Sequence, residues 1–168
     1  METRKWIRTI GILIILATNI GCDQVSKSIV RERLDAYQRV ELAGDYFIMT
    51  RVENTGAFLS LGNSLPAPLR IILLSVFPAL IMCYGLYYLF SRRALSWVMI
   101  LGLCFIIGGG IGNLYDRIVY GSVTDFLHMD FVIFRTGIFN MADVSIMVGT
   151  FLILIYSFLR QRFEEVKG

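Results

Sequence analysis

Long runs of apolar residues, separated by short charged clusters, dominate the pattern of this chain. Residues 71–91 and 94–115 contain no charged side chain, and residues 137–159 contain only Asp143. Because a helix needs about 20 apolar residues to cross the hydrocarbon core of a bilayer, each run predicts a membrane span. A shorter run, 9–22, becomes long enough if its helix continues with a polar outer end at the headgroups. We expect spans at about 8–27, 70–91, 94–115 and 137–159.

The N-terminal apolar run, residues 9–22, also permits a second interpretation. It follows a basic start and ends at Gly21-Cys22, as the apolar region of a cleaved lipoprotein signal does. Against this, Asn19 occupies the third position before the cysteine, where such a signal needs a large aliphatic residue. We therefore expect a retained first helix that runs past Asp23.

The positions of basic residues near the predicted spans indicate the topology. Short cytoplasmic flanks are enriched in Lys and Arg. Three basic clusters fall on the same side of the four spans: Arg4, Lys5 and Arg8; Arg92 and Arg93; and Arg160, Arg162 and Lys167. Both termini are therefore expected in the cytoplasm, and two loops, about 28–69 and 116–136, are expected outside.

The first outer loop changes its pattern from helical to strand-like. Alternating apolar residues between Val40 and Val52, interrupted by Gly44-Asp45, predict a short hairpin. Residues 119–124 or 131–134 are candidates to pair with it. Since unpaired strand edges are not tolerated in lipid, the small sheet is expected on the outer face. The fold class is thus a mainly α membrane protein of four helices with a small extracytoplasmic sheet.

Composition agrees with one membrane domain over residues 1–168. Apolar residues make up 56% of the chain and charged residues 17%, below the roughly 25% of soluble domains. No linker or repeat divides the chain. The net charge of +3 forms no basic stripe with interleaved aromatics, which argues against nucleic-acid binding. Three cysteines, Cys22, Cys83 and Cys104, lack metal-like spacing and are expected to be buried apolar residues.

Acidic residues at the ends of membrane helices are the main candidates for chemistry. Insertion of an acid into a span costs about 2.5–3.5 kcal/mol, so such residues are candidates for a functional role by default. Asn113 and Asp116 close the third predicted span, and Asn140 and Asp143 open the fourth. In each pair the spacing of three places both side chains on one helical face.

A third acid, Asp125, lies in the loop between these motifs, so three aspartates can converge at one depth. Two close carboxylates share a proton, and such a pair can activate water and protonate a leaving amine. The structural alternative is that these acids only cap or pair, as Asp116 beside Arg117 suggests. The spacing leaves open which two aspartates would act together.

Five sequence blocks, considered as a set, resemble the bacterial lipoprotein signal peptidases, also called signal peptidase II. In order they are Asp23-Gln24-Val25-Ser26-Lys27, Asn54-Thr55-Gly56-Ala57-Phe58, Gly112-Asn113-Leu114-Tyr115-Asp116-Arg117, Val123-Thr124-Asp125-Phe126 and Phe139-Asn140-Met141-Ala142-Asp143. Their order and spacing cover nearly the whole chain. One block departs from the family, because Phe58-Leu59 replaces its usual Ala-Phe step.

The resemblance implies an aspartic endopeptidase of the inner membrane with Asp125 and Asp143 as its catalytic pair. It also implies site-lining or supporting roles for further motif positions: Asp23, Lys27, Asn54, Gly56, Asn113, Asp116, Arg117, Asn140 and Ala142. The implied substrates are prolipoproteins that carry a diacylglyceryl group on a cysteine, with cleavage just before that cysteine. Membrane lipids are the other expected partners, and no metal or other cofactor is implied.

Rival functions have weaker support. Ser26 and Lys27 are adjacent, so on a helix they point about 100° apart and make a poor nucleophile and base. A metallopeptidase lacks support because His128, expected in a loop, is the only histidine. A proton-coupled transporter would place its ionisable groups near the bilayer midplane, whereas these acids gather at one face; a membrane scaffold is the other non-enzyme alternative.

A glycine run, 108–112, could mark a dimer face. Close helix approach within one monomer explains it more simply, so we expect a monomer.

Overall fold

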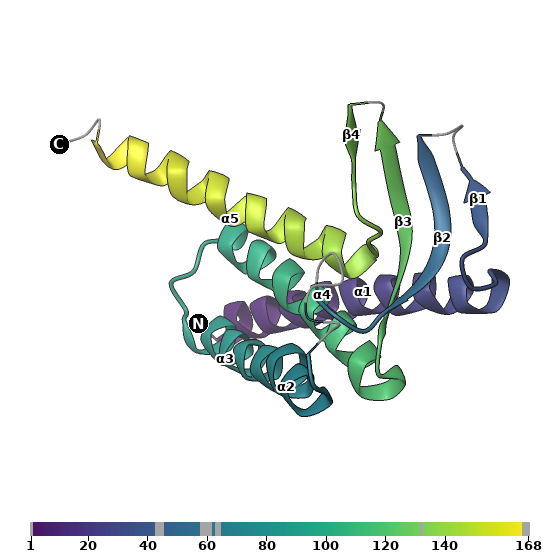
Figure 1. Ribbon diagram of the computed structural model, residues 1–168. Coiled ribbons are helices and arrows are strands. Elements are labelled where there is room, and N and C mark those ends of the chain that lie inside the picture. The colour runs from purple at the N-terminus through teal and green to yellow at the C-terminus, as the bar shows by residue number, and fades with distance from the viewer. Residues whose placement is uncertain (1, 43–45, 58–61, 63–64, 132, 166–168) are drawn as a thin grey trace.

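The computed structural model describes residues 2–42, 46–57, 62, 65–131 and 133–165. Its elements, in chain order, are α1 (Glu2–Arg33), β1 (Arg39–Glu41), β2 (Phe47–Asn54), α2 (Ala67–Ile71), a π-helical segment η2 (Ile72–Val76), α3 (Phe77–Ser91), α4 (Trp97–Tyr120), β3 (Val123–Phe131), β4 (Phe134–Arg135) and α5 (Met141–Glu165). Figure 1 shows the helices gathered in a bundle and the strands standing beside its one end.

Within the described part of the chain, four helical segments are long and apolar enough to cross a membrane: Lys5–Arg33, Ala67–Ser91, Trp97–Tyr120 and Met141–Phe163. The predicted fold class, a mainly α membrane protein with a small sheet, is confirmed. The second span is continuous from α2 through η2 to α3. Pro66 is the N-cap of α2, and Pro68 lies in the first turn, where a fixed φ and a missing N–H suit the start of a helix.

The helix ends differ from the predicted spans for local reasons. Helix α4 begins at Trp97 because the Ser96 hydroxyl caps the Met99 N–H, and it ends where Gly121 adopts a left-handed φ of 74°. The helix therefore begins after and ends beyond the predicted span 94–115, and Asp116 and Arg117 lie inside a helix rather than at the start of an outer loop. The predicted loops 28–69 and 116–136 begin later than expected.

Helices α1 and α5 are also displaced from the predicted spans 8–27 and 137–159. Helix α1 continues to Arg33, beyond the expected end, because Val30 and Leu34 are buried against Phe126 of the sheet. The helical pattern at the start of the first predicted outer loop is thus a continuation of the same helix. Helix α5 starts only at Met141, since Asn140 occupies its N-cap position.

The sheet is antiparallel with the order β1-β2-β3-β4. The predicted hairpin is confirmed in β1 and β2, although its turn at Gly44-Asp45 lies outside the described residues, as does Phe58. Of the two predicted partner segments, 119–124 is helical up to Tyr120 and joins β3 only at its end, while 131–134 falls at the β3–β4 turn. His128 lies in β3, not in a loop, and pairs with Ile48.

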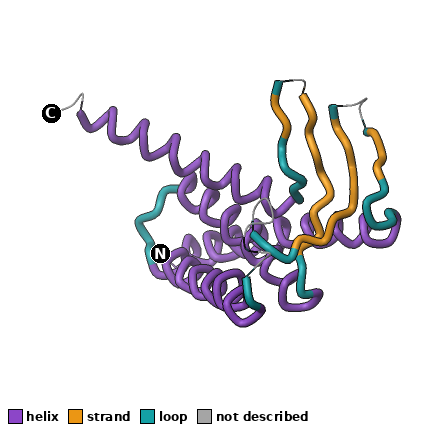
Figure 2. The backbone as a smooth tube through the Cα atoms, in the orientation of Figure 1, coloured by secondary structure: helices purple, strands orange, loops and turns teal. Residues whose placement is uncertain are grey.

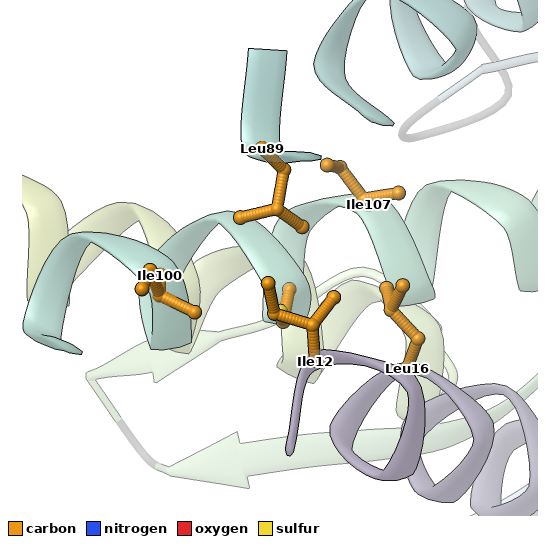
Figure 3. Close-up of a cluster of buried hydrophobic side chains, with 6 residues drawn as sticks. Ile12, Leu16, Leu89, Ile100 and Ile107 are labelled. Atoms are coloured by element: carbon orange, nitrogen blue, oxygen red, sulfur yellow. The ribbon is translucent and has the colours of Figure 1, made fainter. Parts of the chain in front are cut away.

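Helix α4 occupies the centre of the bundle and packs against α1, α3 and α5. Figure 3 shows its residues Ile100 and Ile107 against Ile12 and Leu16 of α1 and Leu89 of α3. Of the three cysteines only Cys104 is buried here. The prediction for Cys22 and Cys83 was wrong, because both face outward from the bundle, where lipid surrounds an apolar side chain.

The glycine run of α4 permits close helix approach within this chain. A Cβ on Gly108 would lie 2.8 Å from Asn19 Cβ of α1, and one on Gly110 or Gly112 would collide with Met82 or Asp23. These distances show that the run brings α4 against its neighbours in the same molecule. The sequence interpretation of close intramolecular packing is confirmed.

Candidate active site

A cavity of about 200 Å³ opens where the last turns of α4 meet the start of α5, the end of β2 and the start of β3. Both predicted dyad members, Asp125 and Asp143, line it. The other lining residues are Asn54, Ala57, Leu74, Pro78, Asn113, Arg117, Val123, Ile138 and Asn140. Two carboxylates, three carboxamides and one guanidinium thus face a cavity whose other walls are apolar.

Asp125 is placed by β3 and is only 4% exposed. Two amides hold its carboxylate: Asn140 Nδ2 donates to Oδ1 at 2.6 Å, and Asn54 Nδ2 donates to Oδ2 at 2.9 Å. Burial, with a smaller contribution from the nearby Asp143 charge, raises the pKa of Asp125 to about 6 even though the two amide bonds oppose the rise. The protonated form is therefore accessible near neutral pH.

Asp143 lies in the first turn of α5 and is half-buried. Its Oδ2 accepts from the Asn140 backbone N–H at 3.2 Å, while Asn140 Oδ1 accepts from the Asp143 N–H at 3.1 Å. This reciprocal pattern is a capping box, which explains the Asn-x-x-Asp spacing locally. The remaining oxygen, Oδ1, accepts from Asn113 Nδ2 at 2.8 Å. Asp143 therefore has a structural role as well as a place in the cavity wall.

The carboxamides form a relay between the two acids. Asn140 Nδ2 donates both to Asp125 and to Asn113 Oδ1, and Asn113 Nδ2 donates to Asp143. Asn113 Oδ1 also accepts from Lys27 Nζ at 2.9 Å. Asn113 Oδ1 accepts from Lys27 and Asn140, so the NH₂ group at the other end of the amide points to Asp143. Hydrogen bonds at both ends thus fix the orientation of the Asn113 side chain.

A balanced ion network lies behind the cavity. Lys27 Nζ contacts Asp23 Oδ2 at 2.8 Å and Asp116 Oδ2 at 3.1 Å, and Arg31 contacts Asp116 Oδ1 at 2.9 Å. Lys27 and Asp116 are fully buried. The expected pairing of Asp116 with Arg117 was wrong: in a helix, adjacent side chains diverge, and Asp116 turns inward to α1. Both carboxylate oxygens of Asp116 form ion pairs with Lys27 and Arg31, and Asp116 does not line the cavity.

The remaining predicted residues support the segments around the cavity. Arg117 donates to the Gly56 carbonyl at 2.9 Å, and Asn54 Oδ1 accepts from the Gly56 N–H at 2.9 Å, so both hold the chain after β2. Ala142, fully buried, donates its N–H to Asp23 Oδ1 at 2.9 Å and thereby attaches α5 to α1.

Sequence reasoning missed several residues that complete the site. Gln24 donates to both Asp23 and Asp116, and Arg31 also donates to Thr124 at 2.8 Å. Arg31 follows Lys27 by four residues, a helical spacing that could have identified it. No signal in the sequence pointed to the apolar walls Leu74 and Ile138. Among the residues described, no group of His, Cys, Asp or Glu is placed to hold a metal ion.

Comparisons with known proteins identify the family and the fold of this chain. The family model for signal peptidase (SPase) II matches residues 13–159. Lipoprotein signal peptidases of Desulfitobacterium hafniense and Clostridioides difficile are each 37% identical to this chain, over 95% and 86% of its length and over 96% and 92% of their own. A solved bacterial membrane enzyme superposes with a TM-score of 0.80 at 24% identity, covering 90% of this chain and 89% of the other.

The match spans nearly the entire chain, and the four apolar helices agree with a multi-pass protein of the bacterial inner membrane. The chain belongs to the signal peptidase II family of aspartic peptidases, which remove signal peptides from prolipoproteins.

Proposed function

We propose that Asp125 and Asp143 are the catalytic pair of this peptidase. The observation that carries the proposal is that both carboxylates line one cavity, whereas the third candidate, Asp116, has its oxygens engaged by Lys27 and Arg31. Each member of the pair keeps its position through an asparagine amide. The raised pKa of Asp125, about 6, suits a pair that shares one proton.

The reaction follows from this arrangement. One carboxylate takes a proton from water, which attacks the scissile carbonyl carbon, while the protonated carboxyl donates its proton to the carbonyl oxygen. The resulting tetrahedral intermediate then collapses: the first acid gives its proton to the amine nitrogen, the C–N bond breaks, and one hydroxyl of the intermediate returns a proton to the second carboxylate as the C=O bond re-forms. Asn54, Asn113 and Asn140 hold both acids in place without adding charge, and Arg117 holds the chain after β2.

The substrate in this proposal is a prolipoprotein whose cysteine carries a diacylglyceryl group, cut just before that cysteine. Leu74 and Pro78 of the second span and Ile138 form an apolar wall beside the two acids. Acyl chains anchored in the bilayer would hold the scissile bond at the depth of this wall. Such remote binding lowers the barrier by orienting the bond that reacts.

The proposal includes a single membrane domain that acts as a monomer, with both termini in the cytoplasm and the cavity at the outer face. Arg8 of α1 donates to the Leu89 and Arg92 carbonyls at 2.7 Å, so the N-terminal helix start and the α3–α4 connection share one end of the bundle. Figure 1 shows the sheet and its neighbouring cavity-forming elements at the other end. Basic clusters favour the cytoplasmic side for the first end.

The test replaces Asp125 or Asp143 with Asn and follows cleavage of a diacylated prolipoprotein by gel shift. We expect each variant to lose at least about 100-fold in rate, since positioned acid and base groups contribute that much or more. Asp130→Asn is the matched control, because Asp130 is on β3 but pairs with exposed Arg135 instead of lining the cavity. Wild-type activity in either dyad variant would sink the assignment.

A further inference from the structure

The second membrane span contains a π-helical segment beside the cavity of the two aspartates. This segment, η2, lies between α2 and α3, and Figure 2 shows the whole span as one continuous helix. Leu74 of η2 and Pro78 of α3 both line the cavity. Since π turns inside α-helices occur frequently at functional sites, the segment is a candidate for a role in the reaction.

Pro78 explains why the helix changes its geometry here. In a regular α-helix the proline ring would collide with the Leu74 carbonyl, and proline has no N–H to donate to that carbonyl. The π turn relieves the collision by a shift in pairing, in which the Phe77 N–H donates to the carbonyl of Ile72, five residues before it. Two successive carbonyls, those of Leu73 and Leu74, therefore lose their α-helical donors.

The helix cannot replace both of the lost hydrogen bonds. The Leu73 carbonyl has no regular donor left, because Pro78 is the residue five positions further on. For the Leu74 carbonyl only the Ala79 N–H remains, and the α-helical acceptor of that N–H is the Ser75 carbonyl. An unsatisfied backbone carbonyl is costly inside a bilayer, where lipid offers no donors. These carbonyls therefore need a donor from outside their own helix.

The Leu74 carbonyl is directed toward the cavity. A helical carbonyl points along the axis toward the residue four positions further on, so this carbonyl lies between the Leu74 and Pro78 side chains that line the cavity. The three asparagine amides of the cavity donate to its two acids. A molecule bound in the cavity is therefore the natural source of a donor for Leu74.

A peptide substrate brings donors that match this acceptor. The scissile bond must leave helical geometry before water and two acids can reach its carbonyl group from opposite sides. The backbone N–H groups just before that bond then lose their own helical acceptors, at a depth where lipid supplies none. An enzyme carbonyl freed by a proline can replace one of these acceptors, so each partner satisfies a group that the other leaves unpaired.

We propose that the Leu74 carbonyl accepts a hydrogen bond from a backbone N–H of the signal segment, shortly before the lipidated cysteine. This bond holds the segment in an extended conformation and positions the scissile bond against the two acids. Because both partners are backbone groups, the bond does not select among the side chains of signal segments. The inference rests on the proposed function, which places the scissile bond at this cavity.

The experiment compares wild type with Pro78→Ala, which returns the missing N–H to the helix. The substrates are diacylated peptides in which, one at a time, an amide N–H before the cysteine is replaced by an ester oxygen. In wild type, one of these esters should lower kcat/KM about fivefold, the effect of one neutral hydrogen bond. Pro78→Ala should lose about the same factor on the all-amide substrate and should not respond to that ester.

Pro68→Ala is the matched control, because Pro68 lies in the first turn of α2, where a missing N–H breaks no helical bond. It should keep the wild-type response to the esters. Leu74→Ala removes an apolar side chain but keeps Pro78, so it should slow all substrates and still respond to the same ester. The ratio of ester to amide rates is taken within each enzyme, so a smaller folded fraction cancels.

Three results would overturn the proposal. The first is a Pro78→Ala enzyme that slows all substrates equally and still responds to the ester, since Pro78 would then act by packing alone. The second is a wild type that tolerates every ester, and the third is a Leu74→Ala enzyme that has lost the response. All of these enzymes retain Asp125 and Asp143, so such a failure leaves the catalytic pair intact. Activity of the Asp→Asn variants would refute the pair separately.

Discussion

Removal of Lys27 tests how the buried ion network supports the site. Lys27 is fully buried and contacts Asp23 and Asp116 at 2.8 and 3.1 Å, while Arg31 is the other cation of the cluster. Two acids and two bases give a formal charge of zero. The substitution Lys27→Met keeps much of the side-chain volume but leaves a net charge of −1 in the protein interior.

The expected cost is large because the charge cannot reach water. Breaking a buried pair by removal of one partner costs about 3–5 kcal/mol. For a chain of this size that corresponds to a fall in Tm of about 6–20 °C. The matched control is Arg135→Met, which breaks the Arg135–Asp130 pair at the same N–O distance of 2.8 Å. Arg135 is 75% exposed, so its loss should cost within about 1 kcal/mol.

The assay is thermal unfolding in one detergent for the wild type, Lys27→Met, Asp116→Asn and the double variant. The double variant restores a formal charge of zero, with Asp23 and Arg31 remaining. We expect it to be more stable than the sum of the single changes predicts, by about 0.5–3 kcal/mol. Additive effects, or a Tm loss for Lys27→Met no greater than that for Arg135→Met, would refute the reasoning.

Three further predictions concern pH, helix packing and the substrate. Because burial raises the pKa of Asp125 to about 6, the singly protonated pair is lost as the pH rises through that value. The pH profile of kcat/KM should therefore fall on its alkaline side with a midpoint near pH 6, and a flat profile from pH 5 to 8 would contradict this prediction. Gly108→Ala places a Cβ 2.8 Å from Asn19 Cβ and should lower the free energy of unfolding by about 1–3 kcal/mol, measured by thermal unfolding. Gly21→Ala is the control, because its Cβ meets nothing within 4 Å and should not destabilise the protein; equal effects of the two changes would exclude the close-approach explanation. Precursor without the diacylglyceryl group should be cleaved slowly in the gel-shift assay, and equal rates for both precursors would remove the anchoring argument.

The sequence determined those features that depend on local chemistry. Apolar run length gave four membrane helices, because a span must satisfy its own backbone hydrogen bonds over the thickness of a bilayer. Alternation between Val40 and Val52 gave the hairpin. The Asn-x-x-Asp spacing predicted that Asn140 and Asp143 lie close together, and the structure shows that they do so as a capping box, with Asn140 at the N-cap just before α5.

Tertiary structure decided the features that require segments distant in sequence. Asp116 and Asp125 are equivalent candidates by spacing, but only packing of α4 against α1 turns Asp116 toward Lys27 and leaves Asp125 at the cavity. The extent of α1 also depends on tertiary contacts. Lys27 stays inside the helix because Asp116 of α4 forms an ion pair with it, and Asp23 does so because the Ala142 N–H of α5 donates to its carboxylate. A buried charge is stable only where the fold places an oppositely charged or hydrogen-bonding partner next to it. That partner comes from a segment distant in sequence, so no local pattern predicts it.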